Sequence, residues 1–483
     1  MNKTYSIKTF GCQMNHSDSE RIASFLESQG LEPLTRNENA DLPAEALAKA
    51  GLVIFNTCGV RQMAEDRVYG QVHNLKKANP KIKIVLTGCL ANRKDVQRRL
   101  KNKVDLFSPI NNFELFENFI IENSLKTCLP AGKVVNCKLK ISAQKNIELS
   151  KENISYLSIK PKLTNAYQAF VPIMTGCNNF CAYCVVPYAR GREVSRPAEE
   201  IIYEVKNLVK KGYKEITLLG QNVNSYSDGK INFSKLVKKV NAIPGKFWIR
   251  FVSNHPKDVS PEMIETVTKC KKVCEAFHLP IQAGNDEVLR KMNRKYTAQE
   301  YLILVKKIQA AFKKNKSGVP AVITSDIIVG FPSETKKQFL DSAEIMEKVG
   351  YDMVFFGQFS PRPGTPAWNM KDSVSKTEKA RREQFLNEIL KKTALKNSKK
   401  FLNTTVEILI EKESSPRAKL LDSKSLALGK HHIYFGKTRT GKNVKMTISN
   451  DCHPELVEGS LIGKIIKVKI TKVSIWNLEG EIV

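Results

Sequence analysis

Three cysteines in one short loop constrain the fold and the chemistry of this chain more than any other feature. Cys177, Cys181 and Cys184 form a C-x3-C-x2-C pattern that directly follows an apolar run at 169–174, which we expect to be a β-strand. Three thiolates at this spacing can bind three irons of a [4Fe-4S] cube and leave the fourth iron without a protein ligand. The pattern therefore predicts a cluster with one open coordination site.

An open iron suits the chemistry of S-adenosylmethionine. It can chelate the amino and carboxylate groups of this cofactor, and one electron from the cluster then cleaves the sulfonium to give a 5′-deoxyadenosyl radical. The end of a strand is also where α/β barrels carry their active sites. A structural zinc loop is the alternative, but such sites take four ligands and no fourth ligand lies nearby in the sequence. The motif resembles that of the radical S-adenosylmethionine superfamily.

Length and charge set the general class of the chain. Its 483 residues correspond to about three domains. The 78 Lys and Arg exceed the 48 Asp and Glu by 30, which favours a polyanionic partner, either nucleic acid or an acidic membrane surface; a generally lysine-rich composition is the plainer explanation. No run reaches the ~18 apolar residues of a spanning helix, and no secretory signal precedes the first predicted strand. We expect a cytoplasmic monomer that does not bind membranes.

The first 124 residues alternate predicted strands with predicted helices. The segments 5–9, 52–56 and 82–87 are typical of strands, and 52–56 is a continuous apolar run, whereas segments 19–29 and 63–77 are typical of helices. A continuous apolar strand is buried on both faces, as in a parallel sheet. Residues 1–124 are therefore expected to form an open α/β domain with a parallel sheet.

The rest of the chain divides into three parts. Residues 125–162 hold eight Lys and two Glu with weak periodicity, which indicates a basic linker. Residues 163–396 have six predicted strands, fewer than the eight of a full barrel of ~250 residues, so we expect a partial (β/α)6 barrel. These strands are expected at 169–174, 215–219, 247–252, 276–279, 321–329 and 353–359. Helices are expected to start at Ser195 and Ser333, the second ending at Gly350.

Residues 397–483 follow a predicted helix at 376–400 and differ in pattern from everything before them. Short β-rich runs are separated by Gly, Asn and Asp, which is typical of a small all-β barrel. The runs lie at 404–410, 432–436, 444–448, 463–470 and 478–483.

A second set of cysteines follows the strands of the N-terminal domain. Cys12, Cys58 and Cys89 each come just after one of the three predicted strands. Because the carboxyl ends of parallel strands share one edge of a sheet, we expect these thiols to converge. Three thiols without a fourth partner again indicate a cluster with an open iron. Three small buried residues at strand ends are the alternative, and spacing alone leaves both open.

Motifs distributed over nearly the whole chain add a family resemblance. They are GCQMN at 11–15, NTC at 56–58, GC at 88–89, LGQNVNSY at 219–226, SNHP at 253–256, HLPIQAG at 278–284, MNRKYT at 292–297, DIIVGFP at 326–332 and SPRPGTPA at 360–367. With the cysteine loop, they resemble the methylthiotransferase family of radical S-adenosylmethionine enzymes, and GCQMN and GQNVNSY favour its MiaB branch. The segments FGKTRTGK at 435–442 and LEGEIV at 478–483 resemble the family's TRAM domain. The resemblance does not extend to 125–162 or 412–424.

The resemblance implies a specific chemistry. Cys12, Cys58 and Cys89 would hold an auxiliary [4Fe-4S] cluster that carries the inserted sulfur, and the C-x3-C-x2-C loop would hold the radical-generating [4Fe-4S] cluster. Two molecules of S-adenosylmethionine serve each turnover, one to methylate the sulfur and one to make the radical. The MiaB branch methylthiolates C2 of the adenine of N6-isopentenyladenosine beside the anticodon of tRNA. The implied partners are the tRNA anticodon stem-loop, an electron donor and a sulfur donor.

Two alternatives remain open. Sister branches of the family run this chemistry on threonylcarbamoyl-adenosine in tRNA or on an aspartyl residue of a ribosomal protein. An RNA-binding protein whose clusters are only structural would belong to another class. The open iron argues against this second alternative, because structural sites are usually fully ligated.

Five further residues are candidates for binding S-adenosylmethionine. Tyr183 lies between two cluster ligands, where it can meet the adenine of the cofactor. Gln221 and Asn222 follow the second predicted barrel strand, and Gln282 follows the fourth. Arg294 can pair with the carboxylate of the cofactor. Each of the five can equally be an ordinary polar residue at a strand end.

The C-terminal barrel is the expected RNA-binding element. Arg439, Lys442 and Lys445 are candidates for phosphate contacts. Stacking would come from Tyr434, Phe435 and Trp476. A charged surface is, however, more often simply solvated.

The remaining cysteines and histidines get a structural interpretation. A disulfide framework is not expected for an odd count of 11 cysteines in a reducing compartment. The cysteines concerned are Cys128, Cys137, Cys270, Cys274 and Cys452. The barrel histidines His431, His432 and His453 are expected at the surface.

Overall fold

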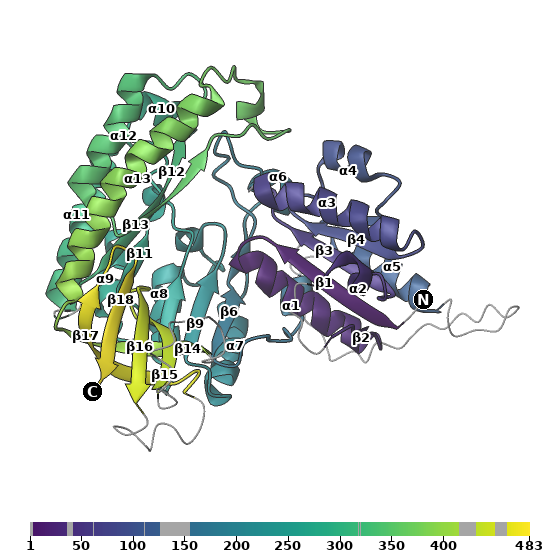
Figure 1. Ribbon diagram of the computed structural model, residues 1–483, viewed down its shortest axis with the longest axis horizontal. Coiled ribbons are helices and arrows are strands. Elements are labelled where there is room, and N and C mark those ends of the chain that lie inside the picture. Colours follow the sequence, from purple (N-terminus) through teal and green to yellow (C-terminus); the bar gives the residue numbers. More distant parts are fainter. Residues whose placement is uncertain are drawn as a thin grey trace, which may run out of the picture.

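The structure is a computed structural model, and it describes residues 3–35, 42–60, 62–110, 112–125, 155–316, 318, 320–414, 431–449 and 461–483. These residues form an N-terminal α/β domain, a central body of parallel strands covered by helices, and a C-terminal β-barrel (Figure 1). Most of the predicted linker at 125–162 lies outside the described residues, as do Cys128, Cys137, Cys452 and His453. In the described ranges, no helix is long and apolar enough to cross a membrane.

The N-terminal domain is built on a five-stranded parallel sheet with the strand order β2-β1-β3-β4-β5. Its strands are β1 (Thr4–Phe10), β2 (Glu32–Pro33), β3 (Leu52–Thr57), β4 (Lys83–Gly88) and β5 (Leu106–Ser108). Its helices are α1 (Gln13–Ser28), α2 (Ala44–Leu47), α3 (Gln62–Ala78), α4 (Lys94–Leu100) and α5 (Phe113–Leu125). Alternate residues of β3 enter two cores, Ile54 with α1 and α5, and Phe55 with α3 and α4. The predicted open parallel sheet is confirmed.

Helix α1 begins earlier than predicted. The sequence placed its start near Ser19, because 13–18 are mostly polar and lack an apolar period. In the structure it begins at Gln13, and the Oδ1 atom of Asn15 accepts the backbone N–H of Cys12 at 3.2 Å. This bond satisfies a donor that the first turn would otherwise leave exposed. The predicted start was wrong by six residues.

The central body contains the six predicted parallel strands, divided between two sheets of three. The strands are β6 (Gln168–Pro172), β9 (Glu215–Leu219), β10 (Trp248–Phe251), β11 (Ala276–His278), β12 (Val322–Val329) and β13 (Met353–Gln358). The helices are α6 (Val186–Arg190), α7 (Ala198–Lys210), α8 (Phe233–Asn241), α9 (Pro261–Lys269), α10 (Asp286–Lys291), α11 (Ala298–Asn315), α12 (Lys336–Val349) and α13 (Lys376–Ser398). Short 3-10 helices lie at Ser155–Ser158, Val223–Ser225, Pro256–Asp258, Pro366–Asn369 and Lys399–Phe401. The predicted partial barrel is confirmed.

Two predicted helix starts were also wrong. Ser195 belongs to a short antiparallel pair, β7 (Met174–Thr175) with β8 (Val194–Ser195), so α7 begins only after Pro197. Helix α12 begins after Thr335, whose side chain accepts the N–H of Gln338. The predicted end of α12 at Gly350 is confirmed, since this residue takes the left-handed φ of 65° that suits glycine.

The core of the central body lies between the strands and their helices. Alternate residues of β12, such as Ile323 and Ile327, pack there with apolar residues of α7, α8, α11 and α12. Helices α11, α12 and α13 cover the outer face of β11–β13 (Figure 1). Each fully buried Val, Leu or Ile contributes about 1.5–3 kcal/mol relative to exposure.

The C-terminal part is a closed five-stranded barrel, as predicted. Its strands are β14 (Thr405–Ser414), β15 (His431–Thr438), β16 (Asn443–Ser449), β17 (Ile465–Val473) and β18 (Asn477–Ile482), in the order β14-β15-β16-β18-β17. The barrel packs against the amino ends of the central strands through Leu409, Trp248 and Cys274.

Two residues predicted to contact RNA instead dock this barrel onto the central body. Arg439 pairs with buried Glu275 at 2.9 Å, and Lys442 pairs with buried Asp352 at 3.0 Å. Burial alone would raise the pKa of Glu275, but Arg439 lowers it below its usual value. Tyr434, predicted to stack on RNA, is buried inside the barrel. These three assignments were wrong, because their partners lie far away in the sequence or inside the barrel.

Candidate active site

The three N-terminal cysteines follow three neighbouring strands. The backbone N–H of Cys58 donates to the carbonyl of Phe10, and that of Cys89 donates to the carbonyl of Thr57, both at 2.7 Å. These bonds continue the ladder of β1, β3 and β4 beyond the strand ends, so the loops of Cys12, Cys58 and Cys89 lie side by side. Cys58 and Cys89 are buried and Cys12 is exposed.

Local side chains explain why these loops take this form. Gly88 has a φ of 82°, and a Cβ atom added there would lie 2.4 Å from the carbonyl oxygen of Thr57, so this position requires glycine. The amides of Asn15 and Asn56 are buried and bonded to each other: Asn15 Nδ2 donates to Asn56 Oδ1 at 2.9 Å. They tie the start of α1 to the end of β3.

The C-x3-C-x2-C loop lies between the short strands β7 and β8. The N–H of Cys177 donates to the carbonyl of Gly191 at 3.2 Å, and that of Cys184 donates to the carbonyl of Cys181 at 2.9 Å. Arg294 Nη1 lies 3.4 Å from Cys181 Sγ. Burial raises the pKa of Cys184, and the neighbouring thiols raise it further. Thiolates in such a loop need nearby positive charge, as a metal cluster would supply.

The two cysteine sets face each other. A Cβ atom added at Gly59 would lie 3.2 Å from Cys89 and 3.2 Å from Val185, the residue after Cys184. Cys89 also contributes to the raised pKa of Cys184. The loops of both sets therefore border one interface between the domains. Within the described ranges, no three His, Cys, Asp or Glu side chains surround the position of a single metal ion.

Two buried arginines of the central body hold this interface. Arg190, at the end of α6, donates to Asp18 of α1 at 2.5 Å, and both side chains are almost completely buried. On the Cys58 side, Arg362 Nη2 donates to the carbonyl of Val60 at 2.8 Å, and Arg362 Nη1 lies 3.5 Å from Glu65. Arg190 thus contacts helix α1, which begins directly after Cys12. Arg362 contacts the backbone two residues after Cys58.

Buried polar atoms without partners lie at the carboxyl ends of β9 and β10. They are Gln221 Oε1, Asn222 Oδ1 and Asn254 Oδ1, none of which is hydrogen-bonded in the structure. Such atoms cost about 1–3 kcal/mol each when left unpaired. An acceptor trio of this kind fits a ligand with N–H or O–H groups, such as the amino and ribose groups of S-adenosylmethionine.

The other predicted cofactor residues lie around the cysteine loop. Tyr183 packs against an apolar cluster that includes Met292 and Ala283, and burial raises its pKa. Gln282 has a φ of 74° and bridges to β12 through its backbone. Arg294 donates to Tyr296 Oη and to the carbonyl of Pro280, both at 2.8 Å, in addition to its contact with Cys181. The structure thus brings these residues together, and their role toward the cofactor stays a prediction.

Sequence reasoning assigned no role to Asn254 and His255, although the SNHP motif contains both. Asn254 Nδ2 donates to the carbonyl of His278 at 2.9 Å. Burial first, and then the positive charges of Arg294 and Lys257, together lower the pKa of His255 to about 2, so this imidazole is neutral. The signal in the sequence that could have found these two residues is the polar run at 253–255, which follows the strand β10.

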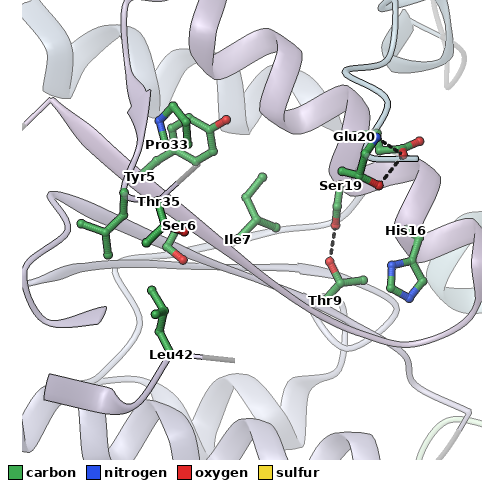
Figure 2. Close-up of a pocket in the computed structure, with 12 residues that line it drawn as sticks. Tyr5, Ser6, Ile7, Thr9, His16, Ser19, Glu20, Pro33, Thr35 and Leu42 are labelled. Atoms are coloured by element: carbon green, nitrogen blue, oxygen red, sulfur yellow. Dashed lines mark hydrogen bonds between the residues drawn. The ribbon is translucent and has the colours of Figure 1, made fainter. Parts of the chain in front are cut away.

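A separate pocket lies in the N-terminal domain between β1, the end of β2 and α1 (Figure 2). Thr9 and Ser19 share a hydrogen bond of 2.7 Å across it. Glu20 accepts from the Thr164 hydroxyl at 3.0 Å at its rim. None of the six predicted cluster ligands is among the residues that line it.

Comparisons with known proteins agree with this geometry. The sequence model of the radical SAM superfamily matches residues 171–346, and that of the uncharacterized protein family UPF0004 matches residues 4–108. A radical S-adenosylmethionine methyltransferase, TsrM, from Kitasatospora setae shares the fold with a TM-score of 0.50 at 13% identity, over 76% of this chain and 77% of that chain. The fold and the cysteine loop thus define a radical S-adenosylmethionine protein.

The full-length relatives identify the family more specifically than the superfamily does. The tRNA-2-methylthio-N(6)-dimethylallyladenosine synthase of Clostridium novyi (strain NT) is 40% identical over 100% of this chain and 97% of its own length. That of Finegoldia magna is 39% identical over 99% of this chain and 94% of its own. The chain belongs to the family of tRNA-2-methylthio-N(6)-dimethylallyladenosine synthases.

Proposed function

We propose that this chain transfers a methylthio group to C2 of the adenine of N6-isopentenyladenosine beside the anticodon of tRNA. The observation that carries the proposal is the meeting of two cysteine sets at Gly59, one from each domain. Full-length relatives at about 40% identity carry the name of this activity. The sister substrates, threonylcarbamoyl-adenosine and a ribosomal aspartyl residue, have no comparable support.

The residues present fit the cofactors that this chemistry needs. Three thiols in one loop suit a [4Fe-4S] cluster, and Cys177, Cys181 and Cys184 would hold it beside S-adenosylmethionine. Cys12, Cys58 and Cys89 would hold a second cluster of the same type. When bound, these groups supply one-electron cleavage of the sulfonium, abstraction of the C2 hydrogen and the sulfur atom that is inserted.

The chain's own residues bind and orient. Gln221, Asn222 and Asn254 offer unpaired acceptors at the strand ends, which would fix the cofactor against the cysteine loop. Arg294 brings positive charge to Cys181. Arg190 and Arg362 hold the two domains together around the thiols. Since effective chemistry between two bound groups depends on a fixed approach, this rigidity is part of the proposed mechanism.

The proposed partners are the tRNA anticodon stem-loop, an electron donor and a sulfur donor, with the chain acting as a monomer in the cytoplasm. The net charge of +30 favours the RNA. With Arg439 and Lys442 committed to docking, exposed Lys445 and the partly exposed Trp476 stay candidates for RNA contact.

Nucleoside mass spectrometry of tRNA tests the substrate. In a strain without this gene, the isopentenylated nucleoside that lacks the methylthio group should accumulate. The intact gene should reverse this and a Cys58→Ala variant should not. An unchanged nucleoside profile would contradict the proposal, and loss of methylthiolated threonylcarbamoyl-adenosine would assign the sister activity instead.

Electron paramagnetic resonance tests the clusters. The reduced, reconstituted protein should show a spectrum that changes when S-adenosylmethionine is added. Replacing Cys12, Cys58 and Cys89 together by Ala should remove half of the iron and keep this change. A spectrum indifferent to the cofactor would favour an RNA-binding protein with structural clusters.

A further inference from the structure

The inner face of β12 and β13 carries side chains that have no role in the proposed function as described so far. The register pairs Thr324 with Met353, Asp326 with Phe355, and Ile328 with Gly357. Side chains alternate between the two faces of a strand, and the intervening residues of β12 pack beneath the helices. Asp326, Phe355 and Gly357 therefore point away from the helices, toward the inside of the barrel.

This face combines an exposed aromatic ring with a hydrogen-bonded polar pair. Phe355 is 56% exposed although it lies on a barrel strand. The ring of His278, on neighbouring β11, stands edge-on to it at 6.2 Å. His278 Nε2 lies 3.3 Å from Asp326 Oδ2, and its Nδ1 atom lies 2.9 Å from the hydroxyl of Thr324. The imidazole is thus held in one orientation beside the ring.

Open space lies directly beside Phe355. A Cβ atom added at Gly357, two residues further along β13, would meet no described residue within 4 Å. Gly357 lacks the positive φ that would make glycine necessary for the backbone. A strand interior normally gains from a side chain, so this glycine leaves room for something that is not part of the chain.

The space borders the cysteine loop. Ile328, the register partner of Gly357, packs against the apolar cluster that contains Ala182, and Tyr183 packs against the same cluster. Ala182 and Tyr183 both lie between Cys181 and Cys184. Phe355 lies two residues below Gly357, about 7 Å along the strand. A planar group stacked on Phe355 therefore presents one edge to the cysteine loop.

We propose that Phe355, Gly357 and Asp326 form the subsite for the substrate's purine base, an inference that rests on the proposed function. The base stacks on Phe355, as nucleic-acid bases do on exposed aromatic rings, and its edge passes over Gly357. An N6-alkyladenine keeps one N–H on N6, and the acceptor-only carboxylate of Asp326 matches it. His278 holds that carboxylate in place.

Equilibrium binding of a stem-loop RNA tests this subsite without turnover. The reconstituted protein with S-adenosylmethionine is titrated with an anticodon stem-loop that carries isopentenyladenosine, and with the same RNA lacking only that base. Phe355→Leu removes the stacking ring, and Gly357→Val fills the space. Phe385→Leu is the matched control, because Phe385 is also exposed but lies on outer helix α13.

The wild-type protein and Phe385→Leu should bind the RNA with the base more tightly than the RNA without it. Phe355→Leu should weaken binding of the base-carrying RNA by about 5- to 150-fold, the usual effect of losing one stacked base. Gly357→Val should do the same, and in both variants the two RNAs should bind nearly equally. The salt dependence should not change, because the phosphate contacts are untouched.

Two failures can be told apart. If the wild-type protein methylthiolates the RNA but both variants keep its preference for the base, the subsite is refuted and the proposed function stands. If the wild-type protein neither prefers nor modifies the isopentenylated RNA, the proposed function itself fails. A cofactor-induced change in the paramagnetic resonance spectrum of each variant checks that the cysteine loop is intact.

Discussion

Removing the charge of Arg190 should loosen the contact between the two cysteine sets. Arg190→Met leaves the carboxylate of Asp18 fully buried, with 0% of its side chain exposed. The Oδ1 atom of Asp18 already has no donor among the described residues, so the variant leaves the whole carboxylate without a partner. Breaking a buried ion pair from one side typically costs about 3–5 kcal/mol. That is a large part of the 5–15 kcal/mol that stabilises a typical domain.

A double-mutant cycle separates the pair from its neighbours. Urea unfolding followed by circular dichroism should show the full loss for Arg190→Met. The double variant Asp18→Leu, Arg190→Met should lose much less, because replacing both partners by apolar groups is often close to neutral. In the reduced protein, the paramagnetic resonance lines that report the magnetic coupling between the two clusters should broaden in the single variant and sharpen again in the double variant. A single-variant loss below 1 kcal/mol, or additive losses, would refute the reasoning.

Further predictions concern four other residues. Arg439→Met should cost about 3 kcal/mol, since among the described residues Glu275 then keeps only Lys316 as an ionic partner. Hydrogen exchange in β15 and β16 should rise, and unchanged exchange would contradict the docking role. Gly88→Ala should lower the iron bound by the Cys12 set, because its Cβ would meet the Thr57 carbonyl at 2.4 Å, and full iron content in this variant would show that the loop can adapt. The pKa of His255 is about 2 in the folded chain and about 6.5 in the unfolded chain, so the unfolded chain binds the proton first. The free energy of unfolding should therefore fall as the pH drops below about 6.5, by up to about 1.4 kcal/mol per pH unit. His255→Asn should flatten this slope in urea titrations at pH 5 to 7, and an equal slope would exclude His255 as its source. Arg294→Ala should weaken S-adenosylmethionine binding measured by calorimetry while iron content stays the same, and unchanged affinity would rule out its pairing with the cofactor.

The sequence predicted the elements whose signals are local. A run such as LVIFNT becomes β3 because all six residues are buried, and a cysteine directly after such a run must lie at the sheet edge. The meeting of Cys89 with the loop after Cys184 has no local signal in the sequence, because it depends on how two domains pack. Only long-range contacts such as Arg190 with Asp18, separated by 172 positions, determine that packing.

The failed predictions have different physical causes. Charge was taken as a sign of exposure, yet Arg439 and Lys442 have acidic partners that lie 164 and 90 positions earlier. The start of α1 was missed because its first turn is stabilised by Asn15 and by burial against another strand, neither of which leaves an apolar period. Phe355 was overlooked because a lone aromatic residue in a strand looks like core until its face is known.

The docking of the small terminal barrel has a consequence for the size of what this protein can process. The barrel is fastened where the central strands begin, whereas the thiols gather where they end. The longest of those strands, β12, has eight residues, which corresponds to about 26 Å. A ligand that contacts both places must therefore span at least the length of this strand.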